Sequence, residues 1–355
     1  MLGGRIFAIK LIFPGFPGFL FSRDSRGFYI DFPVIPNILP HMKIHIPNSA
    51  FLGNIDPFLR GFEPSNPDTL EITSNPNWVS IHPLVLSMIT AIGLNVKPPN
   101  IHLKLEAKSR AYLVRMGLYK MLGLPCDINI TEHASEGRFI PLQQVRTSDE
   151  LARFITEMIP ILHKDPEQAK TIGYIISELG RNVLEHSWAK NGAILCAQFY
   201  PKSNVIRIGI ADTGDGIKKT INRSHRATTH LEALRLALWP GITGTTPKPG
   251  GTEQNGGAGL FFIKSIAQIN KDFFMIYSGN AFYKLLTNKT MTLNADPFED
   301  RHNQLENLPY WQGTLVGVDI TLNQTREFDA LLAAIRRTYS SLRKTKSPHK
   351  KARFI

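Results

Sequence analysis

Short alternating runs and longer helical runs succeed one another in the first third of the chain. Alternation of apolar and polar side chains predicts three strands, over residues 42–47, 69–73 and 101–105. An apolar run and a helical spacing predict two helices, over residues 85–92 and 107–121. This order of elements predicts a small α/β domain over residues 42–125.

The chain turns polar over residues 126–148, which predicts a linker or an irregular pair of strands. Thr147 then offers a capping side chain, and Asp149 and Glu150 place acids in the first turn of a helix. Two helices are expected over residues 151–161 and 166–186, followed by a strand, a third helix and a late strand. This order predicts a second, larger α+β domain over residues 149–335.

The two ends of the chain lack the pattern of a folded domain. The apolar run near the start is broken by Lys10, Pro14 and Pro17, and the pattern of a signal-peptide cleavage site is missing. We expect residues 1–41 to be a poorly structured extension. Residues 336–355 are expected to form a basic tail, because eight Lys or Arg and no acid occur between Arg336 and Arg353.

Composition narrows the class of protein. The chain has 355 residues, enough for two domains, and its 43% hydrophobic and 20% charged residues exclude a disordered or fibrous chain. With only Cys126 and Cys196, a disulfide framework is excluded and a reducing compartment, the cytoplasm, is expected. No apolar run is long enough to cross a bilayer, so we expect no membrane partner.

The net charge of +12 is concentrated in part in residues 336–355. A basic tail of this kind binds nucleic acid or an acidic protein in some proteins and is a solvated helix end in others. The second interpretation is favoured, because basic tails are common. Nucleic acid therefore stays open as a partner but is not the first choice.

Glu178 and Asn182 form the first chemical motif, within the helix expected over residues 166–186. They are four residues apart, which places both side chains on one helix face, one turn apart. An amide oxygen is a ligand that Mg²⁺ accepts, and a carboxylate beside it can take a proton from an attacking water. Alone, such a pair is more typical of a solvated helix face.

The second motif follows an apolar strand, which ends at Asp212 and continues into Gly214 and Gly216. A carboxylate at the end of a buried strand can accept a hydrogen bond from an exocyclic amine such as that of adenine. The glycines allow a tight turn and a close approach of the backbone to a planar ligand. A hairpin turn with an acidic cap is the plainer alternative.

A glycine-rich segment, residues 250–260, precedes the helix expected over residues 261–269. Backbone N–H groups at such a helix start favour a phosphate, although the segment matches neither a Walker A loop nor a dinucleotide fingerprint. A late strand begins with Gly313 and Thr314, and the Thr314 hydroxyl is placed to reach Asp212 or a water beside it.

Taken in order, the four motifs resemble the sequence boxes of the GHKL ATPases, the family of gyrase, heat-shock chaperones, histidine kinases and MutL. The resemblance covers residues 165–322 and implies a Bergerat-type α/β sandwich, a mixed sheet covered by helices on one face. It implies that ATP and Mg²⁺ bind here and that residues 218–255 form a lid over the ATP. The strand and helix order of residues 42–125 resembles that of STAS-type modules found beside anti-sigma-factor kinases.

The resemblance assigns the site residue by residue. It implies ATP contacts by Asn182, Asp212, Gly214, Gly216, Ile217, Gly256, Gly257, Ala258, Gly259, Leu260 and Thr314. Asn182 would hold the Mg²⁺, Asp212 would bind the adenine amine, and Glu178 would act as general base. The glycine-rich box departs from the family, since Asn255 stands where many members have a further glycine. This departure makes the phosphate contacts of the box less secure.

The implied function is a slow ATPase or a protein kinase of the anti-sigma-factor or histidine-kinase-like type. Two further departures bear on it: no phosphoacceptor helix precedes the motifs, and the chain after Thr321 is too short for the domain that supplies a catalytic lysine in gyrase and MutL. An ATP-gated interaction switch without significant catalysis stays open, as does an ATP-regulated nucleic-acid binder using residues 336–355. A protein partner and a homodimer are expected only by resemblance.

Overall fold

The computed structural model describes residues 20–24, 27–31, 41–62, 67–106, 110–128, 138–159, 165–242, 244, 259–287, 294, 296–322, 333 and 335–337. The chain forms two compact units, Met1–Pro40 and His41–Ile355. In the first unit, β1 (Leu20–Asp24) and β2 (Gly27–Asp31) pair as an antiparallel hairpin. The expected extension over residues 1–41 therefore contains regular structure, because two runs with strand propensity are close enough to fold back on each other.

A seven-stranded sheet is the centre of the second unit, with the strand order β13-β12-β11-β14-β10-β9-β8. Its strands are β8 (Phe139–Val145), β9 (Ala193–Tyr200), β10 (Val205–Asp212), β11 (Phe274–Gly279), β12 (Ala281–Leu285), β13 (His302–Leu305) and β14 (Trp311–Thr321). Every pairing in this sheet is antiparallel. The expectation of a mixed sheet was wrong for these strands. Short connections join β9 to β10 and β11 to β12, and β14 enters the sheet between β10 and β11. β8 lies within the segment expected to be a linker.

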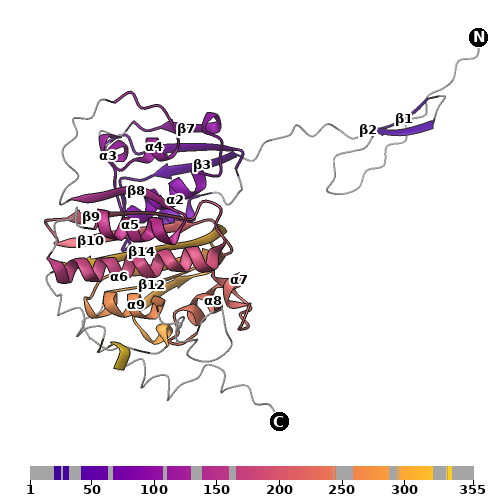
Figure 1. Ribbon diagram of the computed structural model, residues 1–355. Helices are drawn as coiled ribbons and strands as arrows, with labels where there is room; N and C mark the ends of the chain where they lie inside the picture. Colours follow the sequence, from indigo (N-terminus) through magenta and orange to yellow (C-terminus); the bar gives the residue numbers. More distant parts are fainter. Residues whose placement is uncertain are drawn as a thin grey trace, which may run out of the picture. The chain divides into compact units, whose positions relative to one another are not determined.

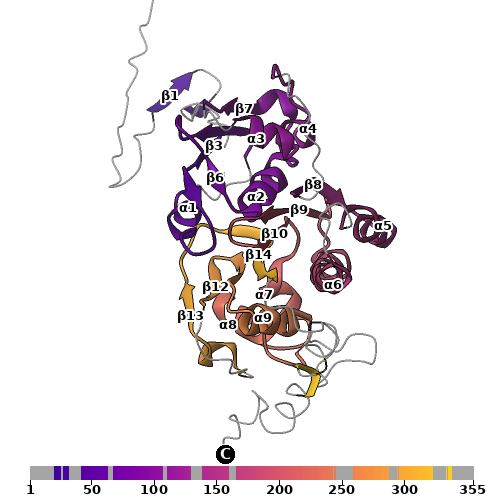
Figure 2. The ribbon, with the colours of Figure 1, turned by 90° about the vertical axis from the view of Figure 1, so that its left-hand side faces the viewer.

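Helices cover one face of this sheet (Figures 1 and 2). They are α5 (Ser148–Met158), α6 (Pro166–Asn182) with a following π-helical turn (Val183–Ser187), α7 (Gly216–Ile221), α8 (His230–Ala237) and α9 (Gly259–Ile269). The predicted start of α5 is confirmed, since the Thr147 side chain accepts from the N–H of Glu150 and the Glu150 carboxylate accepts from the N–H of Arg146. α6 buries Ile172, Ile176 and Leu179 at helical spacing against the sheet.

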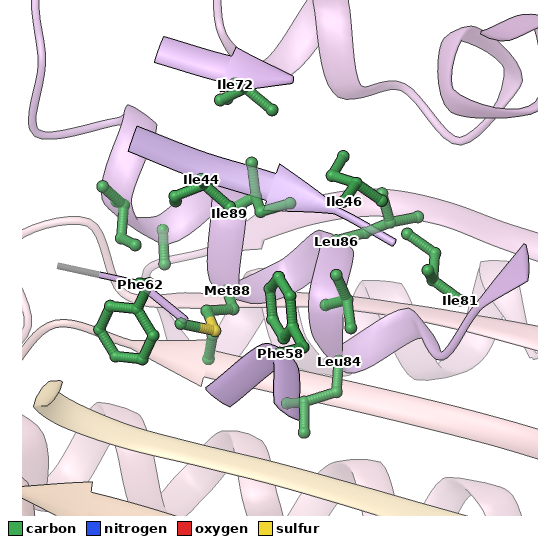
Figure 3. Packing of buried hydrophobic residues seen from close by; sticks show 14 of the residues in the cluster. Ile44, Ile46, Phe58, Phe62, Ile72, Ile81, Leu84, Leu86, Met88 and Ile89 are labelled. Atoms are coloured by element: carbon green, nitrogen blue, oxygen red, sulfur yellow. The ribbon is translucent and has the colours of Figure 1, made fainter. Parts of the chain in front are cut away.

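The opposite face is covered as well, by the N-terminal α/β elements. α2 (Pro83–Gly93) lies directly on β9 and β10, and all its residues are buried. Above it, β3 (His41–Ile46), β5 (Thr69–Ser74) and β7 (Ile101–Lys104) form a parallel sheet. Figure 3 shows Leu84, Leu86 and Met88 of α2 among the apolar side chains of this layer. The expectation that only one face is covered was wrong, because a helix as apolar as α2 requires contacts on all sides.

Shorter elements complete this layer. They are β4 (Ser49–Ala50), α1 (Asp56–Arg60), β6 (Ser80–Ile81), the 3₁₀ turn Pro98–Asn100, α3 (Arg110–Arg115) and α4 (Leu118–Met121). A second 3₁₀ turn, Pro297–Glu299, belongs to the helical side of the central sheet, where Phe298 packs against the apolar cluster of that side. The helix expected over residues 107–121 is interrupted at Gly117, which adopts φ +84°. None of the helices in the described part of the chain is long and apolar enough to cross a membrane.

α2 approaches the central sheet closely because glycine occupies the contact point on β10. A side chain at Gly209 would place its Cβ 2.5 Å from the carbonyl carbon of Pro83, at the start of α2. The Ser87 hydroxyl of α2 donates to the Gly209 carbonyl at 3.0 Å. The backbone of β10 is thus in direct contact with the N-terminal layer.

Replacing Gly209 by Ala should destabilise the fold by about 3 kcal/mol, because the added methyl group overlaps backbone atoms that cannot move independently. Chemical denaturation followed by circular dichroism measures the change in the free energy of unfolding. Gly53→Ala is the matched control, since its Cβ would meet only the Phe273 ring at 3.5 Å. Equal stability of both variants would contradict the close packing of α2 on β10.

Candidate functional site

A cavity of about 420 Å³ opens on the helical side of the central sheet. Its walls come from α6, the turn after α6, the end of β10, α7, the start of α9 and β14. The predicted site residues that line it are Glu178, Asn182, Asp212, Gly216, Ile217, Gly259, Leu260 and Thr314. Side chains from four separate parts of the sequence therefore meet at one cavity.

Three predicted site residues, Gly256, Gly257 and Ala258, lie outside the described residues. Gly214 is not among the residues that line the cavity. A Cβ at Gly214 would lie 2.7 Å from the carbonyl carbon of Ser187, so this position admits only glycine without a backbone shift. The glycine keeps the loop after β10 pressed against the end of the turn that follows α6.

Asp212 is the last residue of β10 and is 1% exposed. Its Oδ1 accepts a hydrogen bond from the backbone N–H of Gly214 at 2.8 Å. The backbone N–H of Thr314 and the hydroxyl of Ser187 also hydrogen-bond its carboxyl group. Burial raises the pKa of Asp212 to about 7, although these donors oppose the rise. The carboxyl group is therefore an acceptor that titrates near neutral pH at the wall of the cavity.

The position of Asp212 is fixed from its backbone as well. Asp212 faces Thr314 across the β10–β14 pair, which explains why Thr314 supports the carboxyl group through its backbone N–H. The indole N–H of Trp311 donates to the Asp212 carbonyl at 3.0 Å. These contacts hold the end of β10, and with it the Asp212 carboxyl group, in one conformation.

Glu178 and Asn182 occupy the last two turns of α6, one turn apart as their spacing predicts. Glu178 forms an ion pair with Arg181, and burial raises the pKa of the Glu178 carboxyl group against the opposing effect of that arginine. The side-chain Nδ2 of Asn182 is buried and has no hydrogen-bond partner in the structure. A buried amide without a partner is costly in a folded protein, which favours a ligand at this position.

The start of α9 lies beside these two residues. A Cβ at Gly259 would overlap the Glu178 carboxylate, so the absence of a side chain lets that carboxylate lie against the first turn of α9. The first N–H groups of an α-helix lack intrahelical partners and carry a partial positive charge. This part of the cavity therefore offers an amide, a carboxylate, a guanidinium group and helix N–H groups within a small space.

The first half of the expected lid over residues 218–255 is largely helical in the structure. α7 and α8 occupy much of residues 218–237, and Ala233 and Leu234 of α8 are buried. The apolar spacing of α8 explains this packing. Ile242 and Gly244 line the cavity, and residues 245–255 lie outside the described part of the chain.

Sequence reasoning missed several residues that lie at the site. Ser187 contacts Asp212, and Arg181 and Arg336 line the cavity. Arg181 directly precedes Asn182 on the same helix, and its place beside a predicted site residue could have identified it. No local pattern pointed to Ser187 or Arg336, because both reach the site through long-range packing. His186 lines the cavity too, and burial lowers its pKa.

Comparison with known proteins adds no family assignment: no family model matches the chain, and a search of curated proteins gives no match. Within the described residues, no cluster of three or more His, Cys, Asp or Glu is suited to hold a metal ion. A metal at this cavity would therefore depend on Asn182 together with oxygens of a ligand.

Proposed function

We propose that this cavity binds ATP together with Mg²⁺, and that the chain is an ATPase or protein kinase of the GHKL type. One observation carries the proposal: Glu178, Asn182, Asp212 and Gly259, predicted from separate motifs, line the same cavity. Motifs that matched the family by chance would have no reason to converge.

The residues present fit a nucleotide. Asp212 supplies a fixed acceptor for an amino group at one part of the cavity wall. Asn182 has a buried amide nitrogen without a partner, and the first turn of α9 offers N–H groups to phosphate oxygens. The Asn182 amide oxygen would hold Mg²⁺, whose charge offsets that of the phosphates. ATP thus satisfies groups that the protein leaves unsatisfied.

Glu178 is suited to move a proton. The raised pKa makes its carboxylate a stronger base than an exposed one, and the Arg181 guanidinium orients it. In hydrolysis, a water would give its proton to Glu178 as its oxygen bonds to the terminal phosphorus, while the bond from that phosphorus to the bridging oxygen breaks and ADP leaves. In a kinase, the hydroxyl or imidazole of a protein partner would take the place of that water.

The proposed fold is a sandwich of the Bergerat type, in which α5, α6 and α9 form the helical layer beside the sheet. Two features support it: these helices share one face of the sheet, and the cavity lies between that face and the start of α9. The STAS-like module, the protein partner, a homodimer and a cytoplasmic location stay predictions from the sequence.

An ATP-gated switch is a second candidate, and a contact between the N-terminal layer and the site favours it. Asn95, two residues beyond the end of α2, donates to the Thr213 hydroxyl at 3.3 Å, and Thr213 directly follows Asp212. Asn191 donates to the same Asn95 side chain at 3.1 Å. A shift of the loop after β10 on nucleotide binding would therefore reach α2.

The affinity for Mg²⁺-ATP should rise about tenfold between pH 6 and pH 8, because Asp212 has a pKa near 7 and the amino group binds its ionised form. Below pH 7 the carboxyl group holds a proton that binding must release; above pH 7 this cost disappears. Calorimetric titration at both pH values, with Mg²⁺ in excess to keep the ATP phosphates ionised, measures the effect.

Failure of ATP to bind at protein concentrations of tens of micromolar would reject the proposed function. Binding that is independent of pH would leave ATP as the ligand and remove Asp212 as the acceptor of its amino group. Titration in two buffers with different ionisation enthalpies distinguishes proton release at Asp212 from an indirect effect of pH on the fold.

A further inference from the structure

Two arginines from distant parts of the chain line the same end of the cavity. Tyr174, Glu178 and Arg181 are spaced along α6 so that they share one helix face, over an axial rise of roughly 10 Å. Arg336 comes from a helical turn far along the chain and lines the cavity with them. Its charge acts on the Tyr174 hydroxyl, opposing the rise in pKa that burial causes there. Arg336 therefore lies near the part of α6 that begins at Tyr174.

The turn that carries Arg336 is anchored in the core. Ile335 is 0% exposed and belongs to the same apolar cluster as Ile175 and Ile176 of α6. Burial of Ile335 fixes the chain at this point, which places the next residue, Arg336, at the cavity wall. Arg336 and Arg337 are both exposed, but only Arg336 is a lining residue; the Arg337 Nε donates to the Ala333 carbonyl at 3.4 Å.

Two guanidinium groups at this cavity are available to bind an anion. Arg181 and Arg336 line the cavity together with the carboxylates of Glu178 and Glu185, and Arg181 pairs with Glu178. Arg181 is half-exposed and can share its N–H donors between Glu178 and a ligand. A guanidinium group matches the geometry of phosphate oxygens with two parallel hydrogen bonds.

We propose that Arg181 and Arg336 together bind the terminal phosphate of the nucleotide, so that the C-terminal turn is part of the site and selects for a triphosphate. The inference rests on the proposed function, because it takes ATP as the ligand of the cavity. It adds that a nucleotide bridges α6 and residue 336, where the basic tail begins. A partner that moves this tail would therefore change the affinity for ATP, and ATP would change the affinity for the partner by the same factor.

The test compares ATP, ADP and AMP, each with Mg²⁺, by calorimetry on the full chain. Arg336→Met should lower the affinity for ATP about tenfold, since it removes one charged hydrogen-bonding partner of a phosphate, and change the affinity for AMP less than about twofold. Arg337→Met is the matched control and should leave all three affinities unchanged. Arg181→Met should show the same dependence on the number of phosphates as Arg336→Met. Circular dichroism confirms that each variant is folded.

Two results would overturn the inference while leaving the proposed function intact. One is an equal loss of ATP affinity in Arg336→Met and Arg337→Met, which would indicate a general effect of charge. The other is an Arg336→Met variant that loses affinity for ATP, ADP and AMP alike, or for none of them. Failure of the wild type to bind any of the three nucleotides would reject the proposed function and the inference with it.

Discussion

Replacing Asp212 by Asn is expected to lower the affinity for ATP by about 100-fold, the upper part of the range for a charged hydrogen bond. The Asp212 carboxyl group is almost fully buried and held by the N–H groups of Gly214 and Thr314. An amide in its place presents an N–H₂ group where the ligand also brings an amino group, so two donors oppose each other. Calorimetric titration of Mg²⁺-ATP measures the loss, and thermal unfolding confirms that the variant is folded.

Asp215→Asn is the matched control for this substitution. Asp215 lies three residues later in the same loop, but its carboxylate pairs with Lys219 at 2.8 Å and Arg223 at 2.7 Å on the surface. Its replacement should leave the affinity for ATP within about twofold, because a surface ion pair contributes little. An equal effect of both substitutions would indicate a general role of loop charge and would contradict the assignment of Asp212.

Glu178→Gln is expected to reduce turnover at least about 100-fold, the usual contribution of a general base, while ATP still binds. Glutamine keeps the size of the side chain and can still contact Arg181, but it cannot accept a proton from water or from a partner hydroxyl group. Release of inorganic phosphate from ATP, or transfer of labelled phosphate to a partner, measures turnover. Calorimetry on the same variant measures binding.

Glu185→Gln controls for the loss of a carboxylate from the cavity, because Glu185 also lines it. Its turnover should stay within a few-fold of the wild type. A wild type that binds ATP without turnover, together with a Glu178→Gln variant that retains ATP-dependent partner binding, would favour the ATP-gated switch over catalysis. Equal turnover in the wild type and Glu178→Gln would reject Glu178 as the base.

Much of the site could be predicted because its signals are local. The four-residue spacing of Glu178 and Asn182 needs only a helix to place both side chains on one face, and α6 is such a helix. Asp212 ends an apolar run, and β10 delivers it to the cavity wall. The local periodicity of the sequence is therefore sufficient to predict where these side chains lie.

Other features depend on contacts between residues far apart in the chain and were missed. Ile335 packs against α6 and brings Arg336 to the cavity, and no local pattern connects residues so distant in the chain. The pairing of β14 with both β10 and β11 likewise follows from packing, and it makes the sheet antiparallel where a mixed one was expected. The burial of α2, by contrast, could be predicted, because its sequence is apolar throughout.

The N-terminal layer contacts β10 next to the site, and this placement bears on regulation. β10 contacts α2 at Gly209, and its last residue, Asp212, lines the cavity. Asn95 reaches the residue after Asp212. A ligand or partner of the N-terminal layer would therefore act on the cavity through one strand, without a long chain of intermediate contacts.

A crystal structure with Mg²⁺ and a non-hydrolysable ATP analogue would show where the nucleotide lies. We expect the adenine amino group at the carboxylate of Asp212 and the Mg²⁺ at the Asn182 side chain. We expect the phosphates at the start of α9, near Gly259. An analogue bound elsewhere, or one whose base lies away from Asp212 while the phosphates avoid Asn182, would contradict the assignment of this cavity as an ATP site.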